Sequence, residues 1–299
     1  METKTSPKIV QSLIGVNQLP FYLKCLKSLT EYCEEEIELI LHTDGTLTEY
    51  DNESVIANFL NQTVRLSDPK QMEQKVLDNL QGRPHCQRIR RESIWGIEFF
   101  DPLFARISDP ISLYLDADIL FFRPFRGLFN SMEIEGGAVF LKDSQWDSYC
   151  LRPWHLMGIG KKPKIVKGMT TAIVCWDKSV IDWDYLEWFL AQTNYHKIPE
   201  WVLPTAQAGL ATNCQAKTIS HKQLPNLYPN AQLTSDTFGV HLLGSYREYW
   251  LPKIKQYQQE MPFAQEAISA HFNSCEFRGA TGYALNQTKR WVNTRLNKW

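Results

Sequence analysis

Short apolar runs alternate along the chain with longer segments in which apolar residues recur at helical spacing. Compact apolar runs bounded by turn residues are typical of buried strands, and the longer segments are typical of the helices that connect them. This alternation predicts βαβ units, and therefore an α/β fold with a mostly parallel central sheet flanked by helices. The predicted strands are Lys8–Gly15, Ile37–His42, Val64–Leu66, Ile111–Leu115, Gly137–Leu141, Ala172–Trp176, Lys217–Ser220 and Phe238–Leu243.

Helical spacing continues to the end of the chain, where the tail from Ile254 to Trp299 is expected to be helical. No linker-like composition divides the sequence. We therefore expect one domain over residues 1–299, with a nucleotide-binding half to about residue 120 and a mixed, acceptor-side half with the helical tail from about 121. The other predicted helices are Phe21–Cys33, Val55–Leu60, Met72–Leu80, Gln87–Ala105, Ile181–Gln192 and Thr205–Thr212.

Composition narrows the possible partners. Lys plus Arg is 32 and Asp plus Glu is 33, which gives a net charge of -1 and no electrostatic footprint for nucleic acid. No run approaches the roughly 18 apolar residues of a spanning helix. The polar start lacks the apolar segment of a secretory signal, so the expectation is a cytoplasmic protein. Seven cysteines without a CxxC pair indicate neither a disulfide framework nor a zinc site.

An acidic pair, Asp116 and Asp118, directly follows the predicted strand Ile111–Leu115. Two carboxylates at the end of a buried strand are costly without a partner, and a divalent cation such as Mn²⁺ or Mg²⁺ is the natural one. Ala117 between them is small enough to let a ligand approach the backbone. Because ligands of open α/β sheets bind at the carboxyl ends of the strands, Asp44 after the second strand is expected at the same edge.

The run Leu113–Phe122 resembles the DxD strand of GT-A glycosyltransferases, which bind nucleotide-diphosphate sugars. The turn Thr43–Thr46 looks like the acidic turn that these enzymes place beside the nucleotide base, although a plain Asp-Gly turn reads the same way. The resemblance implies a GT-A fold and a metal-dependent glycosyltransferase, with a hexose and a UDP-sugar donor favoured. It assigns Asp44, Asp116 and Ala117 to the donor and Asp116 and Asp118 to the metal.

A later segment, Val240–Arg247, is similar to the H-x-x-G-x-x-K segment of the glycogenin-like, retaining members. The similarity implies that His241 is the third metal ligand, that Gly244 belongs to the donor-binding residues and that Arg247 contacts the donor phosphates. Arginine replaces lysine here and can bind phosphate through two hydrogen bonds. This segment alone favours a retaining reaction.

The catalytic residue is less defined. A family Asp-Gln segment corresponds loosely to Ala206-Gln207, which would place Gln207 near the anomeric carbon. An inverting enzyme would instead need a general base, for which Asp143, Asp177 and Glu200 are the candidates. In the helix before the acidic pair, Arg90 and Arg91 could reach phosphate, or they could form a solvated helix face.

Other functions fit parts of the pattern. A nucleotidyltransferase also pairs carboxylates around Mg²⁺, but the stretch after the first strand lacks the expected Gly-rich basic loop. A haloacid-dehalogenase phosphatase would carry Thr or Val at Leu120. A non-catalytic nucleotide- or carbohydrate-binding protein is the third alternative. The acceptor is open between saccharide, protein, lipid and small molecule, with residues Trp146 to Lys167 as an acceptor-side loop.

Overall fold

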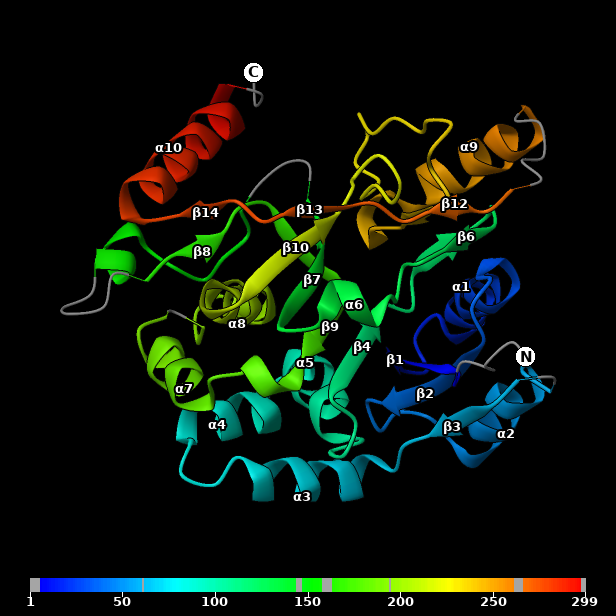
Figure 1. The fold of residues 1–299 in the computed structure, drawn as a ribbon, viewed down its shortest axis with the longest axis horizontal. Helices are drawn as coiled ribbons and strands as arrows, with labels where there is room; N and C mark the ends of the chain where they lie inside the picture. The colour runs from blue at the N-terminus through cyan, green and yellow to red at the C-terminus, as the bar shows by residue number, and fades with distance from the viewer. Residues whose placement is uncertain are drawn as a thin grey trace.

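An eight-stranded sheet lies at the centre of the computed structural model, in the order β13-β10-β7-β9-β4-β1-β2-β3 (Figure 1). The model describes residues 6–60, 62–143, 147–157, 163–193, 195–260 and 266–296. Within the sheet β9 and β13 run opposite to the other strands, so it is mostly parallel, as predicted. Its strands are β1 (Lys8–Ile14), β2 (Ile37–Thr43), β3 (Val64–Leu66), β4 (Ile111–Leu115), β7 (Gly137–Lys142), β9 (Met169–Asp177), β10 (Gln215–Ile219) and β13 (Phe272–Ser274).

Helices cover both faces of this sheet. Alternate residues of a strand point to opposite faces, and in β4 Leu113 packs with α1 and α2 whereas Tyr114 packs with α3, α4, α5, α7 and α8. The sheet is therefore buried on both sides, which explains why its strands read as continuous apolar runs. The helices are α1 (Leu19–Tyr32), α2 (Glu49–Ala57), α3 (Pro69–Asn79), α4 (Pro84–Glu92), α5 (Ile94–Phe104), α6 (Ser131–Ile134), α7 (Trp183–Ala191), α8 (Val202–Leu210), α9 (Arg247–Glu260) and α10 (Ala280–Leu296).

The predicted helix Gln87–Ala105 is in fact two helices, α4 and α5. Ser93 breaks it with an extended backbone (φ −141°, ψ 134°), and its hydroxyl accepts a hydrogen bond from the Trp95 amide at 3.2 Å. Gly96 permits the close approach of the two helices, because a Cβ there would lie 2.3 Å from the Ile89 carbonyl oxygen. The break turns α5 back across the sheet toward β4.

Arg90 and Asp101 fasten α4 to α5. The Arg90 guanidinium donates to the Asp101 carboxylate at 2.6 and 3.1 Å, and both side chains are buried. Burial raises the pKa of Asp101 to about 6, in spite of the opposing charge of Arg90. Arg90 thus has a structural partner and is not directed toward a ligand.

Among the described residues of the tail, helix is confined to α9 and α10. Between residues 268 and 278 the chain forms β12 (Ile268–Ser269), β13 and β14 (Phe277–Arg278), a ribbon that crosses the molecule (Figure 1). These strands pair with β6 (Phe125–Arg126), β10 and β8 (Ile165–Val166), respectively. The predicted helical tail is present as α9 and α10, and pairing with three separate strands decides the conformation of the short segments β12, β13 and β14. None of the described helices is long and apolar enough to cross a membrane.

Candidate active site

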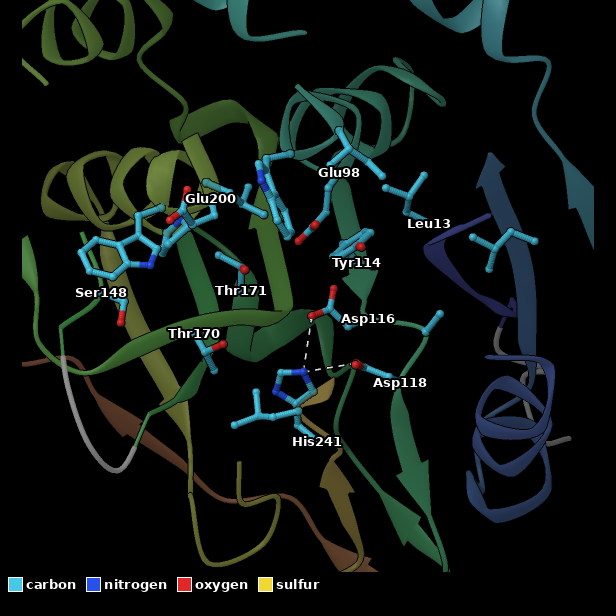
Figure 2. A pocket seen from close by; sticks show the side chains of 18 of the residues that line it. Leu13, Glu98, Tyr114, Asp116, Asp118, Ser148, Thr170, Thr171, Glu200 and His241 are labelled. Atoms are coloured by element: carbon cyan, nitrogen blue, oxygen red, sulfur yellow. Dashed lines mark ion pairs between the residues drawn. The ribbon is translucent and has the colours of Figure 1, made fainter. Parts of the chain in front are cut away.

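Asp116 and Asp118 occupy a tight turn at the carboxyl end of β4. The Asp116 amide donates to the Ala172 carbonyl at 2.8 Å, and the Ile119 amide donates back to the Asp116 carbonyl at 3.3 Å. The chain then enters β5 (Ile119–Phe121). This reversal brings both carboxylates to the same wall of a cavity (Figure 2).

His241 reaches the acidic pair through a second, small sheet. It ends β11 (Gly239–His241), which pairs with β5 in a register that sets His241 opposite Ile119. The His241 Nε2 atom lies 3.2 Å from Asp118 Oδ1 and 3.8 Å from Asp116 Oδ2. One ligand atom from each of the three residues lies within 4.8 Å of the others, so the three can share one ion.

The His241 ring is oriented by Asn226, a residue that the sequence did not single out. Nδ1 of His241 is 2.7 Å from the Asn226 side-chain oxygen, which can only accept a hydrogen bond. Nδ1 therefore carries the hydrogen, and Nε2 of the neutral ring offers its lone pair toward Asp116 and Asp118. Such support behind a histidine is typical of metal ligands. Two carboxylates and an imidazole nitrogen fit Mn²⁺ or a similar divalent cation.

Arg247, at the start of α9, also contacts this group. Its Nη2 lies 3.1 Å from Asp118 Oδ2, and its guanidinium stacks 4.0 Å from the centre of the Phe21 ring. Gly244 begins the short turn before α9 and has open space where a side chain would project. The structure thus brings Arg247 to the acidic pair, whereas Gly244 is outside the residues that line the described cavity.

The charges of Asp116, Asp118 and His241 change one another's pKa values. Burial and the adjacent Asp118 raise the pKa of Asp116 to about 7. Burial would raise the pKa of Asp118, but His241 and Arg247 outweigh it and lower that pKa. Burial would lower the pKa of His241, but the Asp118 carboxylate outweighs it and raises the value. Without a cation, Asp116 and His241 therefore hold protons at higher pH than usual, whereas Asp118 is ionised near neutral pH.

These shifts predict how Mn²⁺ binding depends on pH. A cation must displace protons from Asp116 and from Nε2 of His241, so affinity falls as pH falls. With the pKa of Asp116 at about 7, we expect its proton alone to lower the association constant by up to about tenfold for each pH unit below 7, and the proton on His241 to make the fall steeper. Calorimetric titration with Mn²⁺ between pH 5.5 and 8 measures this, in roughly half-unit steps. An affinity that stays constant over that range would contradict the assignment of these ligands.

The cavity beside the triad has a volume of about 580 Å³, within the range of pockets for small ligands. Its lining includes Gly15 and Asp44, after β1 and β2, and also Glu200 and Trp201, beside the start of α8. The three prospective metal ligands belong to the same lining, so one ligand in this cavity could contact all of these groups.

Asp44 lies at this edge, as the parallel sheet predicts. β1 and β2 pair with Ile14 opposite Thr43, so Gly15 and Asp44 leave the sheet together. The Asp44 carboxylate accepts hydrogen bonds from the amide and hydroxyl of Thr46 at 2.9 and 2.5 Å. It packs over Gly15, where an added Cβ would be only 2.2 Å from Asp44 Oδ2. The glycine therefore makes room for the carboxylate.

The candidate general bases separate into two groups. Asp143 and Glu200 line the cavity, and Asp143 accepts a hydrogen bond from the Tyr228 hydroxyl at 2.9 Å. Asp177 lies at the opposite edge of the sheet, because β9 is antiparallel to β4 and pairs Asp177 with Ile111. Its carboxylate accepts from the Gly136 and Ser179 amides, so Asp177 is not a base for this cavity. Trp146 lies outside the described residues.

Gln207 and Arg91 are not brought to the described cavity wall. Gln207 is buried in α8 and accepts a hydrogen bond from the Trp176 indole at 2.6 Å. It borders a small void of about 10 Å³ that Glu98 also lines. Arg91 is exposed on α4 and is absent from the lining of the cavity among the residues described. Gln207 is thus buried behind the residues that line the large cavity.

Glu98, in α5, is a site residue that the sequence reasoning missed. It is buried, lines the cavity and receives a hydrogen bond from Thr171. Burial, followed by the charges of Asp116 and Asp118, raises its pKa well above the usual range. The available signal was a glutamate within the otherwise apolar helical run from Ile94 to Phe100.

The fold can be compared with solved structures. Mouse xyloside xylosyltransferase 1 in its apo form superposes with a TM-score of 0.54 and 10% sequence identity, over 79% of this chain and 97% of that one. The protein has the GT-A fold. At 10% identity the similarity extends to the fold and not to the activity. No protein-family model matches the chain, and no curated protein matches it by sequence.

Two other solved glycosyltransferases superpose less well. The galactosyltransferase LgtC, in complex with donor and acceptor sugar analogs, has a TM-score of 0.46 and 10% identity, over 86% of this chain and 98% of that one. The glycosyltransferase GlyE of Streptococcus pneumoniae TIGR4 has a TM-score of 0.48 and 13% identity, over 87% and 62% of the two chains. Neither adds to the assignment of the GT-A fold.

Proposed function

We propose that the protein is a divalent-metal-dependent glycosyltransferase that takes its sugar from a nucleotide-diphosphate donor, with a UDP-sugar favoured. The observation that carries the proposal is the meeting of Asp116, Asp118 and His241 on one wall of the 580 Å³ cavity. Three ligands that leave coordination positions free suit a cation bound partly by substrate phosphates. The GT-A fold supports the proposal, and the acceptor is unidentified.

Each region of the cavity has a part in this reaction. Asp44 and the adjacent Gly15 would receive the nucleoside, and the acidic pair with His241 would hold the cation at the diphosphate. A bound cation would neutralise the charge that accumulates on the leaving diphosphate. Arg247 would supply a further positive charge beside Asp118. Asp143 and Glu200 would form the acceptor side.

We further propose that the anomeric configuration is retained. Support comes from the similarity of the Val240–Arg247 segment to retaining enzymes and from the contacts of His241 and Arg247 with Asp118. Gln207 would act from behind the wall in that case, through a rearrangement that opens its hydrogen bond to Trp176. If the reaction inverts, Asp143 or Glu200 would be the base. NMR of the product anomer distinguishes the two.

A screen of nucleotide sugars tests the proposed function. Purified protein is incubated with UDP-glucose, UDP-galactose, UDP-xylose and GDP-mannose, with Mn²⁺ or with EDTA, and release of the nucleoside diphosphate is measured. We expect slow hydrolysis of at least one donor with Mn²⁺ and none with EDTA. Binding of a donor without any turnover, even with added saccharide acceptors, would favour a non-catalytic binding protein. No binding of any donor would refute the proposal.

A further inference from the structure

Two carboxylic acids are buried on the inner side of α5, and they differ in their partners. Asp101 is paired with Arg90 at 2.6 Å. Glu98, one turn earlier, is also enclosed, with 8% of its surface exposed, yet no ion pair reaches it from the part of the chain that the structure describes. A buried acid without a cation is costly in its charged form, which agrees with the raised pKa of Glu98. A protonated carboxyl group can both donate and accept hydrogen bonds, so Glu98 can bind a neutral polar group of a ligand.

The Glu98 carboxyl group faces the cavity. In Figure 2 it points from α5 toward the region of Tyr114, Thr171 and Asp116. Thr171 donates one hydrogen bond to it. Its two oxygens retain hydrogen-bonding capacity beyond this contact, and the part of the carboxyl group that faces the cavity is available to a ligand.

Glu98 does not belong to the proposed metal ligands. Among the described residues, the group whose ligand atoms lie within 4.8 Å of one another consists of Asp116, Asp118 and His241, without Glu98. Glu98 nevertheless lies near enough to Asp116 for their charges to interact. It is thus a polar group of the same cavity as the proposed diphosphate site.

We propose that Glu98 is a specificity-determining residue that forms a hydrogen bond with a hydroxyl group of the donor's sugar. This inference rests on the proposed function. In a nucleotide sugar the group attached to the β-phosphate is the sugar, so a diphosphate held at Asp116 and Asp118 places the sugar beside them. A polar group buried in a site discriminates strongly, because a sugar without the matching hydroxyl leaves it unpaired.

The same placement indicates the class of sugar. Glu98, Asp116 and Asp118 already gather three carboxyl groups on this wall, and the nearby Arg247 is directed to Asp118. The described residues that line the cavity include no Lys or Arg, so the carboxylate of a uronic acid would meet no side-chain cation on this wall. We therefore expect a neutral, hydroxylated hexose or pentose to be preferred over a uronic acid.

The test compares the dissociation constants of UDP, UDP-glucose and UDP-glucuronate with Mn²⁺ present, measured by calorimetry. The variants are Glu98→Ala, Glu98→Gln, which keeps the shape of the side chain, and Glu92→Gln as a matched control at the exposed end of α4. We expect Glu98→Ala to weaken UDP-glucose about 10- to 100-fold while UDP stays within about twofold. Glu98→Gln should cause a smaller loss, and both variants should bind UDP-glucuronate better relative to UDP-glucose.

The outcomes separate this inference from the proposed function. Equal losses for UDP and UDP-glucose would mean that Glu98 only supports the wall or the metal ligands, and would overturn the specificity role. An unchanged affinity for UDP-glucose in Glu98→Ala would overturn it as well. If the wild-type protein bound neither UDP nor UDP-glucose with Mn²⁺, the proposed UDP-sugar donor would fail and the inference with it. Thermal melting of Glu98→Gln checks that the variant is folded.

Discussion

Replacement of Asp118 by Asn is expected to weaken Mn²⁺ binding by more than about 100-fold and to abolish Mn²⁺-dependent turnover. The Asp118 carboxylate contacts both His241, at 3.2 Å, and Arg247, at 3.1 Å. Loss of a residue that only supports a metal ligand lowers metal affinity about 10- to 100-fold, and loss of a direct ligand lowers it further. The measurements are Mn²⁺ titration and the rate of nucleoside diphosphate release.

Asp184→Asn is the matched control for that experiment. Asp184 is 87% exposed on α7 and pairs with Arg83 at the surface, a type of contact worth little. The control should bind Mn²⁺ like the wild-type protein. If Asp118→Asn retained both metal affinity and turnover, the metal site would have to be sought elsewhere, and the DxD resemblance would lose its chemical meaning.

Replacement of Arg90 by Ala is expected to lower the free energy of unfolding by about 3–5 kcal/mol, because removal of one partner leaves the other buried and unpaired. Both side chains are almost fully enclosed, at 5% and 2% exposure. The Asp101 pKa of about 6, already raised by burial, should increase further once the cation is lost. Urea unfolding followed by circular dichroism gives the difference.

The neighbouring residue provides the comparison. Arg91 is exposed, and Arg91→Ala should change the unfolding free energy by less than about 0.5 kcal/mol. A double variant, Arg90→Met with Asp101→Leu, should recover much of the lost stability, because a well-packed apolar pair can replace a buried ion pair. Equal effects of Arg90→Ala and Arg91→Ala would show that the pair does not fasten α4 to α5.

Much of this architecture could be predicted from local patterns. The strand before Asp116 was predicted with its observed bounds, Ile111–Leu115, because Pro110 and the acidic pair bound an uninterrupted apolar run. Asp44 could be placed at the same edge as Asp116 because parallel strands end together. His241 came from a resemblance, and the pairing of β11 with β5 supplies the physical reason for its position.

The features that could not be predicted depend on contacts between segments that are far apart in the sequence. The apolar run of β9 does not indicate its direction, so the sequence could not show that Asp177 lies at the far edge of the sheet. Asn226 supports His241 through a contact between two segments that meet in a single β-bridge, and no local pattern reports that pairing. Glu98 was visible as an acid in an apolar helix, but only the packing of α5 shows whether such an acid meets a cation or a cavity.

The ribbon of β12, β13 and β14 bears on how the molecule is assembled during synthesis. A nascent chain that ends after α9 already contains β10, but β13, which covers the edge of β10, has not yet been made. Until the ribosome adds that segment, β10 presents unpaired backbone groups of the kind that recruit other chains. We therefore expect the pairing of β13 with β10 to be a late step in folding that protects this edge of the sheet from other chains.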